Sequence, residues 1–202
     1  MAENQKTPPV FSKWRAVLAW FGMSFASILL ALVLGGFALA AAFSFLPMLV
    51  LALPIAATVF AYPQSLGMQK YLRSRKPWFL ASGLSLMAAV LAGNGLGSVF
   101  PPKSLTGAIL SYLAGGLIIG LAQWIVLRPI SGRWLVWVPV TMLGIGLEGA
   151  LLQPQLRPFS LFPPGLVYAV VTTLAFAWLT SSGPVDRHAA ETREEDRPIA
   201  RI

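Results

Sequence analysis

The side chain best placed for chemistry is Glu148, because it is the one ionisable residue well inside a predicted membrane span. It follows Trp134 by fourteen residues, which at 1.5 Å per residue puts it roughly 21 Å from the inner surface. A carboxylate at that depth must be protonated, paired or in contact with water, so it is a candidate for ligand binding or proton handling. The structural alternative is an ion pair with Arg157, which lies nine residues further on, past Pro154.

Three polar residues are expected near Glu148 at the outer end of the spans. Asn94 follows Trp78 by sixteen residues, which predicts a similar depth, and Gln153 and Arg157 come shortly after Glu148. Together with Glu148 they form a candidate polar pocket that opens outward. Amide side chains also bridge membrane helices without any functional role, and this alternative stays open for Asn94 and Gln153.

The composition argues against most catalytic and metal centres. The chain has no cysteine and a single histidine, His188, which removes disulfides, thiolate sites and multi-histidine metal sites. No metalloprotease, nucleophile-elbow, Walker or dinucleotide-binding motif is present. One acid within the spans cannot supply the paired carboxylates of an acid–base mechanism. We therefore expect a protein that is not an enzyme and that holds no metal or cofactor.

The elements that carry these residues are predicted to be transmembrane helices. The 202 residues are 56% apolar and 11% charged, with a mean hydropathy of +0.72, whereas soluble domains have about 25% charged residues. A span needs roughly 20 apolar residues. The uncharged run 16–69 holds two spans and is too long for a signal peptide. Four more spans follow in 77–102, 104–127, 134–156 and 158–185. The predicted fold is an all-α bundle of six transmembrane helices.

The distribution of basic residues orients this bundle. Thirteen Lys and Arg residues fall in the amino-terminal segment, in the second and fourth loops and in the carboxy-terminal segment. Only two, Lys103 and Arg157, fall in the other loops. The positive-inside rule then places both termini in the cytoplasm. Residues 1–13 form a cytoplasmic segment, 14–180 the membrane domain and 181–202 a charged, disordered tail. The net charge of +8 indicates anionic lipids on the cytoplasmic side of the bilayer rather than nucleic acid.

The six spans also predict three parallel copies of one helical hairpin. Each copy begins with a tryptophan, Trp14, Trp78 or Trp134, and turns at a Phe/Pro sequence such as Phe100-Pro101-Pro102. The first two copies end on Leu-Arg, at Arg73 and Arg128, each 26 residues after a proline of its turn. Tryptophan, arginine and proline also collect at the ends of unrelated membrane helices, so generic helix ends are the alternative.

The end of the fourth span resembles a motif found in uncharacterised bacterial multi-spanning membrane proteins. Their Gly-x-x-Gln-Trp-x-x-Leu-Arg helix end is matched here from Gly120 to Arg128 and is followed by another Trp-led helix. The inner motif residues are Gln123, Trp124, Arg128 and Trp134, with Gln69 and Arg73 in a weaker copy. The resemblance implies a multi-pass protein of the bacterial plasma membrane, and it brings no established activity with it. An internal photosynthetic membrane is the alternative location.

Small residues at four-residue spacing predict close helix packing. The pairs are Ala38 and Ala42, Gly93 and Gly97, Gly116 and Gly120, and Gly146 and Ala150. Each pair packs either inside the bundle or against another membrane protein, including a second copy of the chain. The leading functional hypothesis is a non-catalytic accessory or scaffold subunit of a larger membrane assembly. The alternative is a small-solute transport component, a substrate-binding membrane subunit with an outward pocket near Glu148.

Overall fold

The fold is entirely helical over the residues that the structure describes. The computed structural model describes residues 10–42, 46–69, 71–72, 74–97, 99–100, 104–153 and 163–181. Within them lie α1 (Val10–Ala42), α2 (Leu46–Met68), α3 (Lys76–Gly97), α4 (Leu105–Leu127), the 3₁₀ helix η1 (Gly132–Val136), α5 (Trp137–Leu151) and α6 (Leu166–Ser181). The prediction of an all-helical chain is confirmed. The predicted tail beyond Ser181 and the first nine residues lie outside these ranges.

Four segments are long and apolar enough to cross a membrane. They are Trp14–Ala31, Lys76–Leu96, Leu105–Leu127 and Gly132–Leu151. The sixteen residues of α6 form a shorter apolar helix. Serines begin two of the elements: the Ser104 hydroxyl accepts a hydrogen bond from the Gly107 N–H of α4, and Ser131 accepts one from Arg133 at η1. This set of apolar helices is that of a membrane protein.

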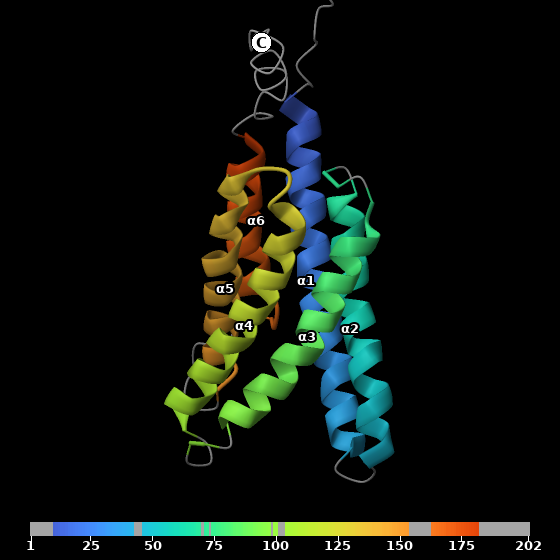
Figure 1. Ribbon diagram of the computed structural model, residues 1–202, viewed down its shortest axis with the longest axis vertical. Coiled ribbons are helices and arrows are strands. Elements are labelled where there is room, and N and C mark those ends of the chain that lie inside the picture. The colour runs from blue at the N-terminus through green and yellow to red at the C-terminus, as the bar shows by residue number, and fades with distance from the viewer. Residues whose placement is uncertain are drawn as a thin grey trace, which may run out of the picture.

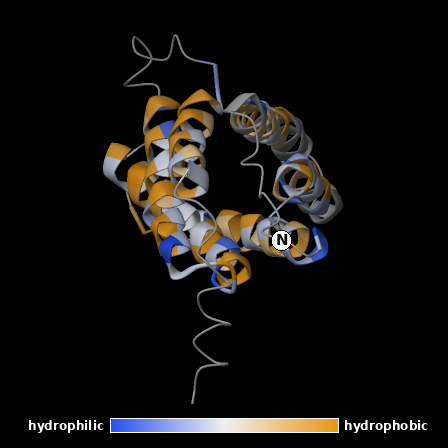
Figure 2. Cartoon of the chain, turned by 90° about the horizontal axis from the view of Figure 1, so that it is seen from above, coloured by the Kyte–Doolittle hydropathy of each residue, from blue (hydrophilic) through white to orange (hydrophobic). Residues whose placement is uncertain are grey.

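The helices pack in chain order around a common axis. Each of α1 to α5 packs on the helix that follows it, and α6 returns to pack on α1. Figure 1 shows that α1 begins and α6 ends at the same end of the bundle, here called the upper end. Seen from above, the six helices surround the axis (Figure 2). The result is a closed ring in which α1, α3 and α5 descend and α2, α4 and α6 ascend.

The closest approach in this ring is the seam between α4 and α5. A Cβ atom added to Gly116 would lie 2.7 Å from the Met142 Cα, and one added to Gly120 would lie 2.9 Å from the Val138 carbonyl oxygen. Backbone atoms cannot give way as a side-chain tip can, so only glycine fits at these two positions. The Gly116 and Gly120 pair predicted to mediate packing therefore packs inside the bundle.

Other predicted small residues also face neighbouring helices. A Cβ on Gly93 of α3 would meet the Ser111 carbonyl oxygen of α4 at 3.6 Å, and Gly146 of α5 lies beneath the Leu113 side chain. The surroundings of the Ala38 and Ala42 side chains and of Gly97 lie outside what the structure describes. Within the described part, these glycines allow neighbouring helices of the ring to pack closely.

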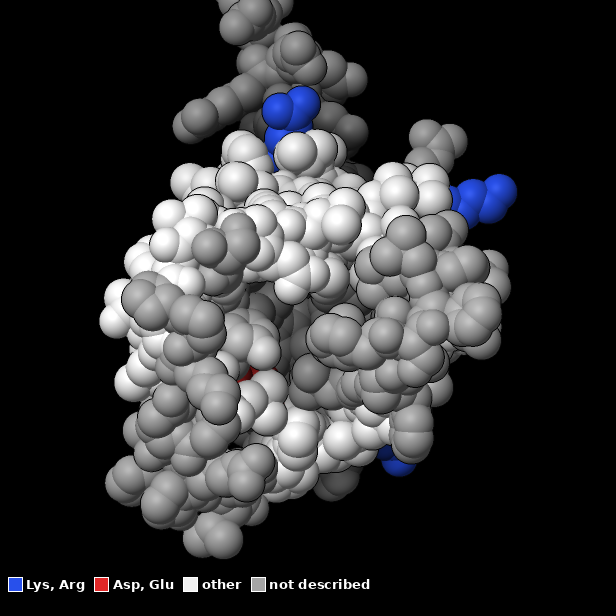
Figure 3. Space-filling model, turned by 90° about the horizontal axis from the view of Figure 1, so that it is seen from below, with Lys and Arg blue, Asp and Glu red and all other residues white. Residues whose placement is uncertain are grey.

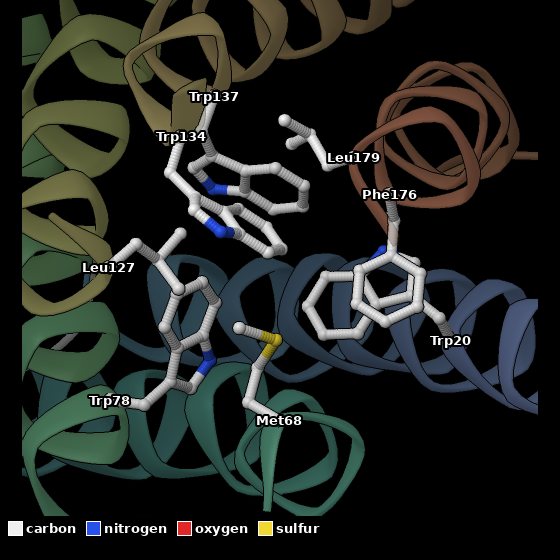
Figure 4. Close-up of a cluster of buried hydrophobic side chains, with 8 residues drawn as sticks. All are labelled: Trp20, Met68, Trp78, Leu127, Trp134, Trp137, Phe176 and Leu179. Atoms are coloured by element: carbon white, nitrogen blue, oxygen red, sulfur yellow. The ribbon is translucent and has the colours of Figure 1, made fainter. Parts of the chain in front are cut away.

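Aromatic side chains fill the interior of the ring near its upper end. Trp20 of α1, Trp78 of α3 and Trp137 of α5 contact one another edge-on, with ring centroids 5.6–6.2 Å apart. Since these helices are not neighbours in the ring, the three indoles meet across its interior (Figure 4). We call them the tryptophan triangle. Phe176 of α6 stacks on Trp20 at 4.8 Å. The surrounding buried residues are Met68, Leu127, Trp134 and Leu179.

The residue of α1 that joins this triangle differs from the one that the repeat predicted. Trp14 is 62% exposed, whereas Trp20, six residues later, is fully buried. Trp134 is buried beside Trp137, in η1 rather than in an α-helix, because the α-helix begins only at Trp137. The three tryptophans that meet are thus Trp20, Trp78 and Trp137, whereas the predicted repeat was aligned on Trp14, Trp78 and Trp134.

Candidate ligand-binding site

A layer of buried polar side chains lies directly below the tryptophan triangle. On the descending helices the polar residue follows its tryptophan by four positions, and on the ascending helices it precedes Met68, Leu127 or Phe176 by four positions. Four positions are about one helical turn on the same face. Each helix contributes one fully buried residue: Ser24, Gln64, Ser82, Gln123, Thr141 and Thr172. We call these six residues the axial polar layer.

Gln123 is the centre of a hydrogen-bond network in this layer. Its amide Nε2 donates to the Gln64 Oε1 at 3.2 Å and to the Ser82 Oγ at 2.9 Å. The indole N–H of Trp137 donates to the Gln123 Oε1 at 2.7 Å. Since an indole can only donate, this last bond fixes the orientation of the amide. One side chain of α4 thereby links α2, α3 and α5.

Replacing Gln123 with leucine should lower the free energy of unfolding by about 2 kcal/mol, since three hydrogen bonds at about 0.6 kcal/mol each are lost. Gln69 provides a matched control, because it is exposed at the end of α2 and Gln69→Leu should change stability little. Reversible unfolding in mixed detergent micelles measures the free energy of unfolding of both variants. Equal losses in the two would contradict the network.

Several polar atoms in the tryptophan triangle, in this layer and below it have no hydrogen-bond partner among the described residues. On the inward faces these are the indole nitrogens of Trp20 and Trp78, the Gln64 Nε2 and the hydroxyls of Ser24, Thr141 and Tyr168. Gln64 faces the Tyr168 hydroxyl, yet that hydroxyl makes no hydrogen bond of acceptable geometry. A buried polar group without a partner costs about 1–3 kcal/mol. These atoms therefore require water or a bound molecule.

Glu148 lies further down, on the inward face of α5, and caps the beginning of α6. It is 7% exposed. One carboxylate oxygen accepts the Gly165 N–H at 2.6 Å, and the other accepts those of Val167 at 3.2 Å and Tyr168 at 3.3 Å. These N–H groups belong to the first turn of a helix, where they have no partner within the helix and carry its positive dipole end. The carboxylate is thus held by backbone N–H groups of the neighbouring helix.

The backbone beside this cap requires a glycine at position 165. Gly165 has φ of +91°, a conformation that residues with a Cβ rarely adopt. A Cβ on Gly165 would also lie 2.9 Å from the Ile28 side chain of α1. Glycine therefore allows α6 to begin close to both α1 and Glu148, at the point where the ring closes.

The lower face of the bundle is hollowed between the helices, and acidic side-chain atoms are visible inside the hollow (Figure 3). Glu148 is the only Asp or Glu in the described part of the chain. Over the same residues, no three His, Cys, Asp or Glu side chains gather as metal ligands would. The interior thus presents polar groups from below and aromatic groups from above.

Asn94 and Gln153, the other described residues of the predicted polar pocket, make no hydrogen bond to Glu148. Asn94 is exposed on α3, which packs on α2 and α4. The Gln153 side chain donates to the Gly149 carbonyl oxygen of its own helix at 3.1 Å, and Arg157 lies outside the described residues. Of the inner motif, Gln123 and Trp134 are buried, Trp124 is half-buried, Gln69 and Arg128 are exposed, and Arg73 lies outside the described residues.

The axial polar layer contains residues that the sequence did not single out, above all Gln64 and Ser82, and Tyr168 lies below it. A usable signal was present: Trp20, Trp78 and Trp137 are each followed by Ser or Thr at the fourth position. No known protein family, curated protein or solved structure matches this chain. The functional argument therefore rests on the geometry of the site.

Proposed function

We propose that this chain is a six-span membrane protein that binds a small solute inside its helical ring, as the membrane subunit of a transport system would. The single observation that carries the proposal is the set of unpartnered polar atoms around the axial polar layer. Pockets for small molecules combine apolar and aromatic walls with a few convergent polar groups. The tryptophan triangle above and the polar layer below it have that composition.

The proposal includes six spans, because α2 and α6 run alongside the four helices that are long and apolar enough to cross a membrane. The upper end is proposed to be cytoplasmic. Its described basic residues, Arg15, Arg75, Lys76, Arg128 and Arg133, are all exposed. By the positive-inside rule these cations favour the cytoplasmic side, in the plasma membrane of a bacterium. The solute would then enter from outside, through the hollow of the lower face.

Three hairpin repeats are part of the same proposal, in a register set by the buried tryptophans. The pairs Trp20 and Ser24, Trp78 and Ser82, and Trp137 and Thr141 have equal spacing on the three descending helices. Their indoles meet at similar centroid distances and interplanar angles of 64–71°. A threefold repetition of one hairpin accounts for both the spacing and the contacts.

The accessory-subunit hypothesis relied on the scarcity of polar groups, on the missing catalytic motifs and on small-residue faces that could dock a partner. Gly93, Gly116 and Gly120 instead face other helices of the same ring. Because these three glycines pack within the ring, the described geometry supports solute binding over scaffolding as the proposed function.

Cysteine labelling tests this proposal, and the chain has no cysteine of its own. Ser85 is buried on α3, one turn below Ser82 of the axial polar layer, while its neighbour Leu84 is 62% exposed on the outer surface of the ring. In membrane vesicles, Ser85→Cys should react with hydroxyethyl methanethiosulfonate at least about tenfold faster than Leu84→Cys, because a thiolate forms in water and not in lipid. Intact-protein mass spectrometry gives the rates. An equal or reversed ratio would contradict a solvated interior.

A further inference from the structure

We infer that the solute is small, uncharged and rich in hydrogen-bond acceptors, such as carbonyl oxygens or ring nitrogens. The inference rests on the proposed solute site and deepens it. It derives from which donors and acceptors in the axial polar layer are already used and which remain.

Each amide oxygen of the layer already accepts one hydrogen bond, which leaves it one lone pair. The Gln64 Oε1 accepts from Gln123, and the Gln123 Oε1 accepts from Trp137. The Ser82 hydroxyl oxygen also accepts from Gln123. A ligand that offered mainly N–H groups would have to share these oxygens with the donors already bonded to them.

The donors, in contrast, are left over. Trp20 and Trp78 each hold a buried indole N–H without a partner, and the Gln64 amide group can donate to a ligand as well. Indole nitrogens can never accept a hydrogen bond. The hydroxyls of Ser24 and Tyr168 add two groups that donate or accept as the ligand demands. This excess of donors selects a ligand with several acceptors.

Electrostatics select against charged ligands. The six residues of the axial polar layer carry no charge, and a lone ion in such surroundings is expensive. Glu148, the only acid in the described part of the chain, already accepts three backbone N–H groups. Its carboxylate repels anions that approach from below, while a cation would have to share the amide oxygens of the layer with the donors already bonded to them. A neutral molecule meets neither obstacle.

Four small probes of similar size separate these possibilities. They are 1,3-dimethyluracil, which is neutral and has acceptors but no N–H donor, p-xylene, which has neither, benzoate, an anion, and 1-methylpyridinium, a cation. Thermal unfolding of the purified full-length protein in detergent, followed by tryptophan fluorescence, reports binding as a rise in Tm. We expect 1,3-dimethyluracil to raise the Tm at a lower concentration than the other three probes.

Two variants test whether the named donors make the contacts. Tyr168→Phe and Ser24→Ala each remove a hydroxyl that has no hydrogen-bond partner among the described residues, so neither should lower the Tm without probe. Each should weaken 1,3-dimethyluracil binding about fivefold to tenfold, the loss of one hydrogen bond. Tyr62→Phe is the control, because Tyr62 is 50% exposed on α2, and it should bind the probe as the wild type does.

The outcomes separate this inference from the proposed function. Tighter binding of benzoate, 1-methylpyridinium or p-xylene would overturn the ligand class while leaving solute binding in place. Binding of 1,3-dimethyluracil that is unchanged in both variants would overturn the assignment of the donors. If no probe raises the Tm, the ligand class is overturned, and the labelling of Ser85→Cys decides separately whether the interior is open to solutes.

Discussion

Replacing Glu148 with leucine should lower the free energy of unfolding by at least about 3 kcal/mol. The substitution leaves the N–H groups of Gly165, Val167 and Tyr168 without their acceptor, and each buried unsatisfied donor costs about 1–3 kcal/mol. It also removes the negative charge from the positive end of α6. Glu148→Gln should lower the free energy of unfolding by less than Glu148→Leu does. Its amide keeps one acceptor oxygen but turns an N–H₂ group toward the backbone donors.

Unfolding of purified protein in mixed micelles measures these losses, with Gln153→Leu as the control on the same helix. The Gln153 side chain bonds only to the Gly149 carbonyl oxygen of its own helix, so its replacement should change stability by less than about 1 kcal/mol. A Glu148→Leu protein as stable as the wild type would show that the cap at α6 contributes nothing.

Gly116→Val should separate α4 from α5 and destabilise the protein by about 3 kcal/mol or more. The new Cβ would lie 2.7 Å from the Met142 Cα and 3.0 Å from two carbonyl oxygens of α5. Overpacking against side chains costs about 1–3 kcal/mol, and backbone atoms can yield less than side chains can. Gly120→Val should behave in the same way, since its Cβ would meet the Val138 backbone.

Gly22→Val provides the control for this seam. Like Gly116 and Gly120, Gly22 lies within a helix, here α1. A Cβ added to Gly22 meets nothing within 4 Å. Its substitution should change the free energy of unfolding by less than about 0.5 kcal/mol. A loss at Gly22 equal to that at Gly116 would mean that the helix, rather than the seam, is sensitive to the β-branched side chain.

The sequence predicted the helices and part of their packing because those depend on local properties. Long uncharged runs indicate helices in a membrane, and Gly116 and Gly120 mark a close helix contact through their spacing alone. The distance of Glu148 from Trp134 along the chain also singled it out as an acid deep within a predicted span. Its partners could not be predicted, because they are Gly165 and the first turn of α6, seventeen to twenty residues later, which pack on α5 only in the folded ring.

The inward face of each helix could not be predicted in the same way. Lipid and protein interior both favour apolar side chains, so the faces of these helices do not differ in hydrophobicity as they do in soluble proteins. The sequence therefore paired Gln123 with Gln69, which is exposed, although the buried partner is Gln64, five positions earlier. Trp14 was preferred to Trp20 for the same reason. Only the repeated spacing of tryptophan and hydroxyl residues carried the missing information.

Closure of the ring by α6 on α1 has a consequence for how the chain is made. The ribosome delivers α1 first and α6 last, so the polar side chains of Ser24 and Gln64 enter the membrane long before the wall around them is complete. A chain interrupted before Leu166 would leave these groups facing lipid and Glu148 without its backbone donors. Maturation of the protein thus depends on one late event, the arrival of α6, which has only sixteen residues.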